Sequence, residues 1–352
     1  MESPAKIRAG FIGIALTFFL LMQLLAQYPT FVERYYSNGL YPVLTLFISG
    51  VTNQFPFSIS EVVLWFALLV VLPVLARRLF KRKMSIVRFF LNLATTISIV
   101  VVWFYVCWGI NYLRVPLITT LKLDRVALEI DAFDSTCVEI IQNANELNLS
   151  YSIKDLAEIN EIVESSYVEV LEELGLKKMP GPKVLKEFAG NWLLNITTTS
   201  GWFSPFFHEV HFNNDLLIIE IPFVIAHEKA HQMGYTNEAE CNFLAYLVCL
   251  NASDPLVQYS GYFNVLGYFL QHLKENQEKR EQFVQSIKEG VKLDLAAVRE
   301  RWKSHRGWVS SLSDKSYDLY LKANQVKEGR QNYARVVDLI VKYNEKISQM
   351  EG

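Results

Sequence analysis

The sequence predicts a mainly α-helical membrane protein, in which three N-terminal transmembrane helices precede a mostly helical α+β domain with a small sheet. The chain is 51% hydrophobic and only 20% charged, with a mean hydropathy of +0.17, which is too apolar for an ordinary soluble protein. Its long apolar runs all lie before residue 115. The following roughly 240 residues have ordinary polarity and suffice for one domain with a core. Strand-like sequence is confined to residues 183–214.

Three apolar segments, at about residues 9–28, 60–79 and 89–113, are long enough to cross a bilayer. The first is interpreted as an uncleaved anchor, because no small-residue cleavage site follows it. Residues 35–59 are interrupted by Gly and Pro, and their apolar run is too short to cross unaided. We therefore predict an interfacial or re-entrant segment there, and a membrane anchor over residues 1–114 in contact with the lipid bilayer.

The positions of the cations predict the orientation of the anchor. Arg77, Arg78, Lys81, Arg82 and Lys83 follow the second span, and positively charged loops stay in the cytoplasm. Lys6 and Arg8, before the first span, agree with a cytoplasmic N-terminus. Three spans then place the domain of residues 115–352, with its helical lead-in over 115–176, outside the cytoplasm.

Charge and cysteine content exclude several classes of function. A net charge of −2 and a pI near 6.3 provide no basic field for nucleic acid. The four cysteines do not form a disulfide framework, and we expect Cys107, Cys137, Cys241 and Cys249 to be buried as small hydrophobic residues. The sequence also lacks a Gly-rich phosphate loop, a CxxC pair and a nucleophile turn, so metal-assisted hydrolysis is the only chemistry with a sequence signal.

That signal is the pentapeptide His227-Glu228-Lys229-Ala230-His231, an HExxH motif in an apolar helix. Residues four apart share one face of a helix, so His227 and His231 can bind the same ion. Glu228 lies beside them and can take a proton from a water that the ion polarises. The pattern is typical of zinc hydrolases and predicts one Zn²⁺ per chain.

A tight reversal is expected after the motif. Gly234 is placed to end the first helix in a left-handed conformation, and Asn237 is a candidate N-cap for a second helix from Glu238 to about Leu250. The third metal ligand is Glu238 or Glu240; we favour Glu238, because Glu240 at the third helical position can be engaged by the cap. Asn242, four residues after Glu238, can orient a liganding histidine.

The HEKAH motif with Glu238 and Asn242 resembles the zincin metallopeptidases, particularly the gluzincins, in which a later helix supplies a Glu followed four residues on by an Asp. The resemblance implies His227, His231 and Glu238 as zinc ligands and Glu228 as the general base. Here Asn242 replaces that Asp, and the gap between His231 and Glu238 is short. Membrane helices followed by HEKAHQMG also resemble an uncharacterised bacterial family of membrane-anchored zincin-like proteins, which implies the bacterial cytoplasmic membrane and a periplasmic domain.

In zincins an edge strand ahead of the motif helix holds the substrate extended, which makes the alternating segment Glu209, Val210, His211, Phe212 and Asn213 a candidate substrate strand. His208 and His211 should point to opposite faces and are interpreted as surface or substrate-side residues rather than ligands of one metal. A donor for the developing oxyanion is also needed. Tyr262, His305 and Tyr333 are our candidates among the downstream residues.

Two functions compete. The favoured one is a membrane-anchored zinc metallopeptidase that cleaves peptides or proteins outside the cytoplasm. The alternative is a catalytically silent sensor or scaffold that keeps the same fold. An intramembrane protease is disfavoured, because the motif helix carries Glu228 and Lys229 and is bordered by polar segments. The sequence does not indicate the substrate or the oligomeric state.

Overall fold

The computed structural model of the chain describes residues 4–81, 85–127, 129, 131–149, 151–181, 184–323 and 333–351. The chain divides into two compact units. Unit 1 contains residues 1–115, 180–189 and 204–209, and unit 2 contains residues 116–179, 190–203 and 210–352. The sequence predicted a division between residues 114 and 115; the structure differs because two later segments pack with the anchor.

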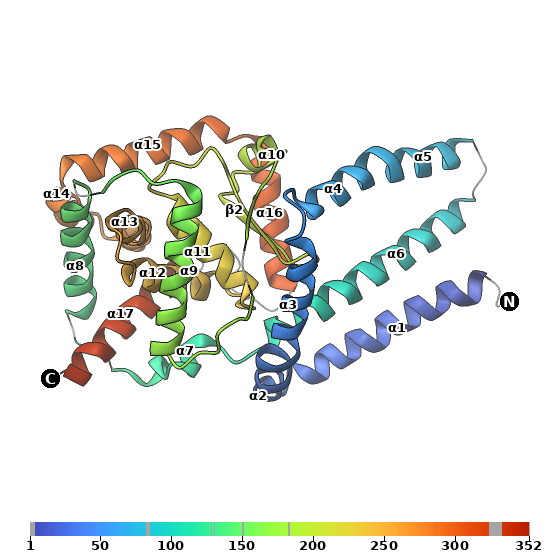
Figure 1. The fold of residues 1–352 in the computed structure, drawn as a ribbon, viewed down its shortest axis with the longest axis horizontal. Coiled ribbons are helices and arrows are strands. Elements are labelled where there is room, and N and C mark those ends of the chain that lie inside the picture. Colours follow the sequence, from blue (N-terminus) through green and yellow to red (C-terminus); the bar gives the residue numbers. More distant parts are fainter. Residues whose placement is uncertain are drawn as a thin grey trace. The chain divides into compact units, whose positions relative to one another are not determined.

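Unit 1 is helical, and α1 (Pro4–Leu25) lies side by side with α6 (Ile86–Cys107) (Figure 1). Helix α6 ends at Cys107, and Gly109 beyond it packs closely on aromatic rings: a Cβ there would lie 2.6 Å from the Phe104 ring and 2.7 Å from that of Tyr105. Its elements are α1 (Pro4–Leu25), α2 (Pro29–Phe31), the π-helix η1 (Val32–Leu40), α3 (Tyr41–Thr52), α4 (Ile59–Phe66), the π-helix η2 (Ala67–Val71), α5 (Leu72–Phe80), α6 (Ile86–Cys107) and the 3-10 helix η3 (Gly109–Leu113).

In the part of the chain that the structure describes, two helical segments, Ile59–Phe80 and Ile86–Cys107, are long and apolar enough to cross a membrane. A third exists if Gly10–Leu25 and Pro29–Thr52, which meet at a bend of 104°, count as one broken span rather than a re-entrant loop. The chain is therefore a membrane protein, and up to three spans agree with the sequence. Its sidedness stays a prediction, and Arg82 and Lys83 lie outside the described residues.

Unit 2 is mainly helical, and its core is the packed group α11 (Ile221–Gln232), α12 (Glu238–Leu250) and α13 (Pro255–His272). Gly261 on α13 lets that helix approach α12 closely, because a Cβ there would lie 2.7 Å from the Cβ of Cys249. All four cysteines are buried and free, as predicted. The helices are α7 (Leu117–Thr120), η4 (Leu123–Arg125), α8 (Ala132–Leu147), α9 (Leu156–Glu173), α10 (Asn191–Ile196), α11 (Ile221–Gln232), α12 (Glu238–Leu250), α13 (Pro255–His272), η5 (Leu273–Glu275), α14 (Gln277–Ser286), α15 (Glu289–His305), α16 (Trp308–Ala323) and α17 (Tyr333–Glu351).

The small sheet has three strands, β1 (Leu185–Glu187), β2 (Gly201–Ser204) and β3 (Glu209–Phe212), in the order β1-β3-β2. The predicted substrate strand, Glu209 to Asn213, is thus the middle strand, and both of its edges are hydrogen-bonded. All five residues from Glu209 to Asn213 are buried. The edge-strand prediction was wrong for this segment. A strand that is paired on both sides has no unpaired backbone N–H and C=O groups with which a peptide could form a further strand.

His208 and His211 are not surface residues, which corrects a second prediction. Both are fully buried. His211 stacks on the Trp202 ring in unit 2, with centroids 5.0 Å apart. His208, with φ of 54°, lies against the ring of Tyr41 in unit 1.

A buried ion pair closes the loop between α3 and α4 in unit 1. Lys186 Nζ donates to Glu209 Oε1 at 2.7 Å and to the carbonyl oxygens of Thr52 and Phe57 at 2.7 and 3.1 Å. The other carboxylate oxygen accepts from the backbone N–H and the hydroxyl of Ser60, at 2.8 and 2.5 Å. Both charges are buried and hydrogen-bonded. Removing one of them therefore leaves the other buried without a partner of opposite charge.

We expect Lys186→Met to cost about 3–5 kcal/mol in the free energy of unfolding, because it leaves the Glu209 carboxylate buried without its cation. The double variant Lys186→Met/Glu209→Gln removes both charges and should recover part of that loss. Thermal unfolding of the full chain in detergent measures both. Equal midpoints for the single variant and the wild type would contradict the assignment.

Candidate metal centre

The first motif helix, α11, ends in a Schellman turn that reverses the chain. Gly234 adopts φ of 86°, a left-handed conformation that glycine reaches without strain. The N–H of Tyr235 bonds to the carbonyl of Ala230 at 3.1 Å, and that of Gly234 bonds to the carbonyl of His231 at 2.9 Å. These two bonds fix the reversal at Gly234, as the sequence predicted, and α11 itself ends at Gln232, one residue after His231.

The second motif helix, α12, begins at the predicted cap. The side-chain oxygen of Asn237 accepts the N–H groups of Ala239 and Glu240 at 2.9 and 3.4 Å. The cap makes Glu238 the first helical residue. Its side chain therefore leaves α12 at the end nearest the reversal, toward α11.

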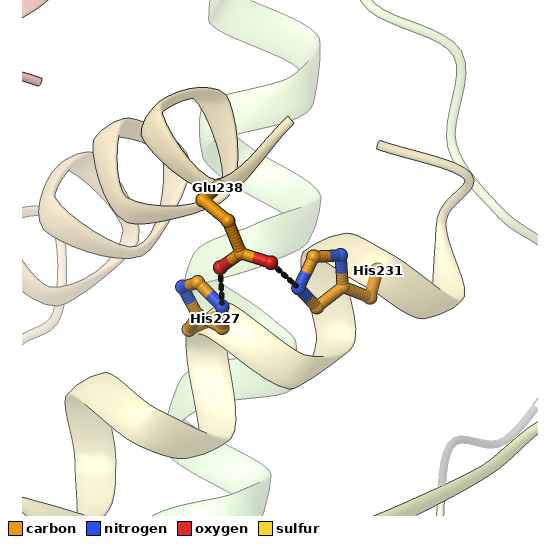
Figure 2. Close-up of side chains that lie close together, drawn as sticks. All are labelled: His227, His231 and Glu238. Atoms are coloured by element: carbon orange, nitrogen blue, oxygen red, sulfur yellow. Dashed lines mark ion pairs between the residues drawn. The ribbon is translucent and has the colours of Figure 1, made fainter. Parts of the chain in front are cut away.

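The two helices bring His227, His231 and Glu238 together (Figure 2). One carboxylate oxygen of Glu238 lies 3.2 Å from His227 Nε2, and the other lies 3.5 Å from His231 Nε2. One atom from each residue can be chosen so that all three lie within 4.8 Å of one another. Ligands about 2.0–2.1 Å from a tetrahedral zinc ion stand about 3.3 Å apart, and each carboxylate oxygen is close to this distance from one of the two rings.

Asn242 holds the ring of His227, in the role that the sequence suggested. Its Oδ1 lies 2.9 Å from His227 Nδ1 and also accepts the hydroxyl of Tyr268 at 3.1 Å. Because this oxygen only accepts, Nδ1 carries the proton and the Nε2 lone pair faces Glu238. Tyr268, on α13, was not found from the sequence, since nothing in its spacing relates it to the motif.

His231 is held by the turn itself. Its Nδ1 donates to the carbonyl oxygen of Tyr235 at 2.9 Å, so its Nε2 also faces Glu238. The Cys241 thiol lies 3.3 Å from both of these atoms. The residue that completes the Schellman turn thus also orients the second imidazole.

Glu240 does not join the cluster. Its Oε1 accepts the backbone N–H of Leu117 at 2.7 Å, and the residue is buried. The sequence expected Glu240 to be engaged near the cap; the structure gives it a partner distant in the chain, the backbone of Leu117. Of the two carboxylates considered, the structure groups only Glu238 with the histidines.

Glu228 is buried between α11 and β2. It receives a hydrogen bond from the backbone of Phe203. A Cβ on Gly201 would lie 2.7 Å from both Cγ and Oε1 of Glu228, so glycine is required for β2 to approach this carboxylate. Burial raises the pKa of Glu228 above its ordinary value, against the opposing influence of His227 and His231.

The described contacts do not bring the predicted oxyanion donors to the cluster. Tyr262 packs against the ring of Tyr246, and His305 pairs with Asp215 at 2.8 Å. The side chain of Tyr333 lies outside the described residues. Instead the hydroxyl of Tyr317, on α16, donates to Glu238 Oε1. Sequence reasoning missed Tyr317, because α16 lies far from the motif in the chain.

The family comparison places the chain in an uncharacterised family and leaves the chemistry open. Residues 36–341 match a family described as "Protein of unknown function (DUF3810)". The chain belongs to this family. The match includes most of the membrane segments and the whole candidate centre, so the HEKAH site lies inside the family's shared region. No curated protein and no solved structure matches the chain.

The donor set suits zinc. Two neutral imidazoles and one carboxylate are the ligands of many catalytic zinc sites, and both histidines have their second nitrogen engaged, as liganding histidines do. Burial alone would raise the pKa of Glu238, but the histidines outweigh it and hold this pKa well below its usual range. For His231, burial opposes protonation, yet Cys241 and Glu238 keep its pKa well above the ordinary value.

The first prediction separates the two candidate ligands. Glu238→Gln should lower zinc affinity by roughly a hundredfold or more, because it removes the charged donor between the imidazoles. Glu240→Gln is the matched control and should retain zinc, because this side chain holds Leu117. The zinc content of the two purified variants distinguishes the two candidate ligands. Loss of zinc from Glu240→Gln and its retention in Glu238→Gln would make Glu240 the ligand.

A second prediction concerns pH. The pKa of His231 is raised, so this side chain stays protonated at pH values above its ordinary titration range. Zinc must therefore displace that proton at neutral pH. Zinc affinity should therefore rise about tenfold per pH unit up to the raised pKa and level off above it. Calorimetry in buffers of different ionisation enthalpy measures the released proton. His305→Ala, outside the cluster, should leave the slope unchanged, and affinity independent of pH would contradict the prediction.

Proposed function

We propose that this protein is a membrane-anchored zinc metallopeptidase that hydrolyses peptide or protein substrates outside the cytoplasm. The observation that carries the proposal is the convergence of His227, His231 and Glu238, with both histidines oriented, beside a buried Glu228. Zinc held by these three side chains supplies a positive charge that polarises a substrate carbonyl and lowers the pKa of a water.

Glu228 acts as the general base. Its raised pKa, which results from burial, brings it closer to neutrality than an exposed carboxylate, so it can take a proton from the attacking water and later give it to the leaving amine. The contact with Gly201 and the Phe203 backbone keeps its carboxylate in place. This chain therefore holds the base rigidly between a helix and a strand.

The strand that offers a substrate ladder is β2 rather than β3. It is an edge strand, and its Gly201 contacts the catalytic base. A peptide that pairs with the outer edge of β2, beside the Phe203 backbone group that bonds Glu228, would be extended, with backbone hydrogen bonds supplying affinity that depends little on side chains. This replaces the sequence-based choice of Glu209 to Asn213.

Tyr317 is the phenol available to the reacting centre. Its hydroxyl donates to Glu238, a ligand, and the side chain remains 39% exposed, so a substrate can reach it. A hydroxyl donor at this place can stabilise negative charge as it develops on the substrate carbonyl. It takes the role that the sequence had given to Tyr262, His305 or Tyr333.

Glu228→Gln should keep zinc and abolish cleavage in a peptide-library assay, because it removes the base and leaves the three ligands. Gly201→Ala, which forces a methyl group against the same carboxylate, should lower cleavage by roughly a hundredfold with zinc retained. The sensor or scaffold alternative predicts that wild type and Glu228→Gln behave identically in that assay and in cells.

A further inference from the structure

Helix α16 has an inner face that belongs to the candidate centre. Ser310 and Leu321 are buried, and Tyr317 contacts Glu238. At about 100° per residue, these three positions fall within about 40° of one another around the helix axis. This side of α16 therefore faces the body of unit 2.

The opposite face carries large apolar side chains in the open. Trp308, Leu312 and Leu319 are 79%, 56% and 68% exposed. They also fall within about 40° of one another, roughly opposite Tyr317. A helix face in contact with water normally carries polar residues, so this outer face is suited to another environment.

Cations accompany the apolar row. Arg306 precedes Trp308, and Lys315 and Lys322 lie beside the row, all three exposed. The acidic residues of the helix, Asp314 and Asp318, lie on the same side as the two lysines but nearer the inner face, and they are partly buried; Asp318 is paired with Lys322 at 2.5 Å. Trp and Leu in a row, with long cationic side chains at its border, are typical of helices that lie in a lipid headgroup interface.

We propose that the outer face of α16 docks on the surface of the lipid bilayer, with its three apolar side chains in the interface and its cations toward anionic headgroups. The chain itself favours this occupant. Its candidate spans, Ile59–Phe80 and Ile86–Cys107, are on the same chain as α16, so a bilayer that holds them is tethered to unit 2. The effective concentration of lipid is therefore far higher than that of any freely diffusing partner.

The docking deepens the proposed function, on which the next step rests. Because the same helix carries Tyr317 on its inner face, a bilayer that holds α16 also holds this hydroxyl over Glu238. Peptide segments that emerge from the membrane or lie along its surface are then the substrate class that reaches the site most readily.

Lipid docking is tested in the full chain, without reference to zinc or cleavage. The variants Leu312→Cys and Leu319→Cys are each labelled with an environment-sensitive fluorophore. The four native cysteines are free thiols but buried, and the wild-type protein, treated in the same way, measures how much they are labelled. The protein is placed in nanodiscs of phosphatidylglycerol and phosphatidylcholine, with nitroxide-bearing lipid as the quencher. Leu293→Cys, at a residue that is 61% exposed on α15, is the matched control.

We expect blue-shifted emission and about twofold or greater quenching at positions 312 and 319, and little at 293, with less quenching when phosphatidylcholine replaces the anionic lipid. Equal quenching at 312 and 293 would overturn the proposal. Blue-shifted but unquenched probes would also overturn it, because a protein then covers the face. Thermal unfolding of each labelled variant verifies the fold. If the probes on α16 are quenched but the protein cleaves no peptide, the docking of α16 on the bilayer stands and only the peptidase proposal is refuted.

Discussion

The eight residues from His231 to Glu238 are the constraint on which the candidate centre depends. A left-handed glycine ends one helix, an asparagine begins the next, and the short connection leaves the carboxylate little freedom except to lie between the two imidazoles. The geometry is local, so it forms as soon as α11 and α12 pack together. A ligand set built this way is preorganised, and little conformational entropy is lost when an ion binds.

The residues that orient the side chains of this centre lie at different distances from the motif in the sequence. His231 is oriented by the carbonyl of Tyr235, a residue of the same turn, whereas His227 depends on Asn242 and, through it, on Tyr268 of α13. Lys229, inside the motif, pairs with Glu164 of α9 on the buried side of α11. Interactions across three helices therefore fix a motif that is only five residues long.

Sequence reasoning succeeded where the determinants are local. Gly234, Asn237 and the start of α12 follow from turn and cap chemistry, and the apolar spans follow from length and hydropathy. It failed where pairing partners are distant. The order of strands cannot be read from alternation alone, which is why Glu209 to Asn213 was misplaced at an edge, and Tyr317 lies 79 residues beyond its partner Glu238.

The buried pair of Lys186 and Glu209 has a consequence for biosynthesis. The loop between α3 and α4 is completed by residues made more than a hundred positions later, so the anchor that enters the bilayer first is still missing two of its own segments. Insertion can precede this closure, but final folding of the anchor must wait until the ribosome has released Glu209. A fragment that stops at residue 115 is therefore an incomplete folding unit, and gene fusions that exchange one anchor for another need to carry residues 180–189 and 204–209 with it.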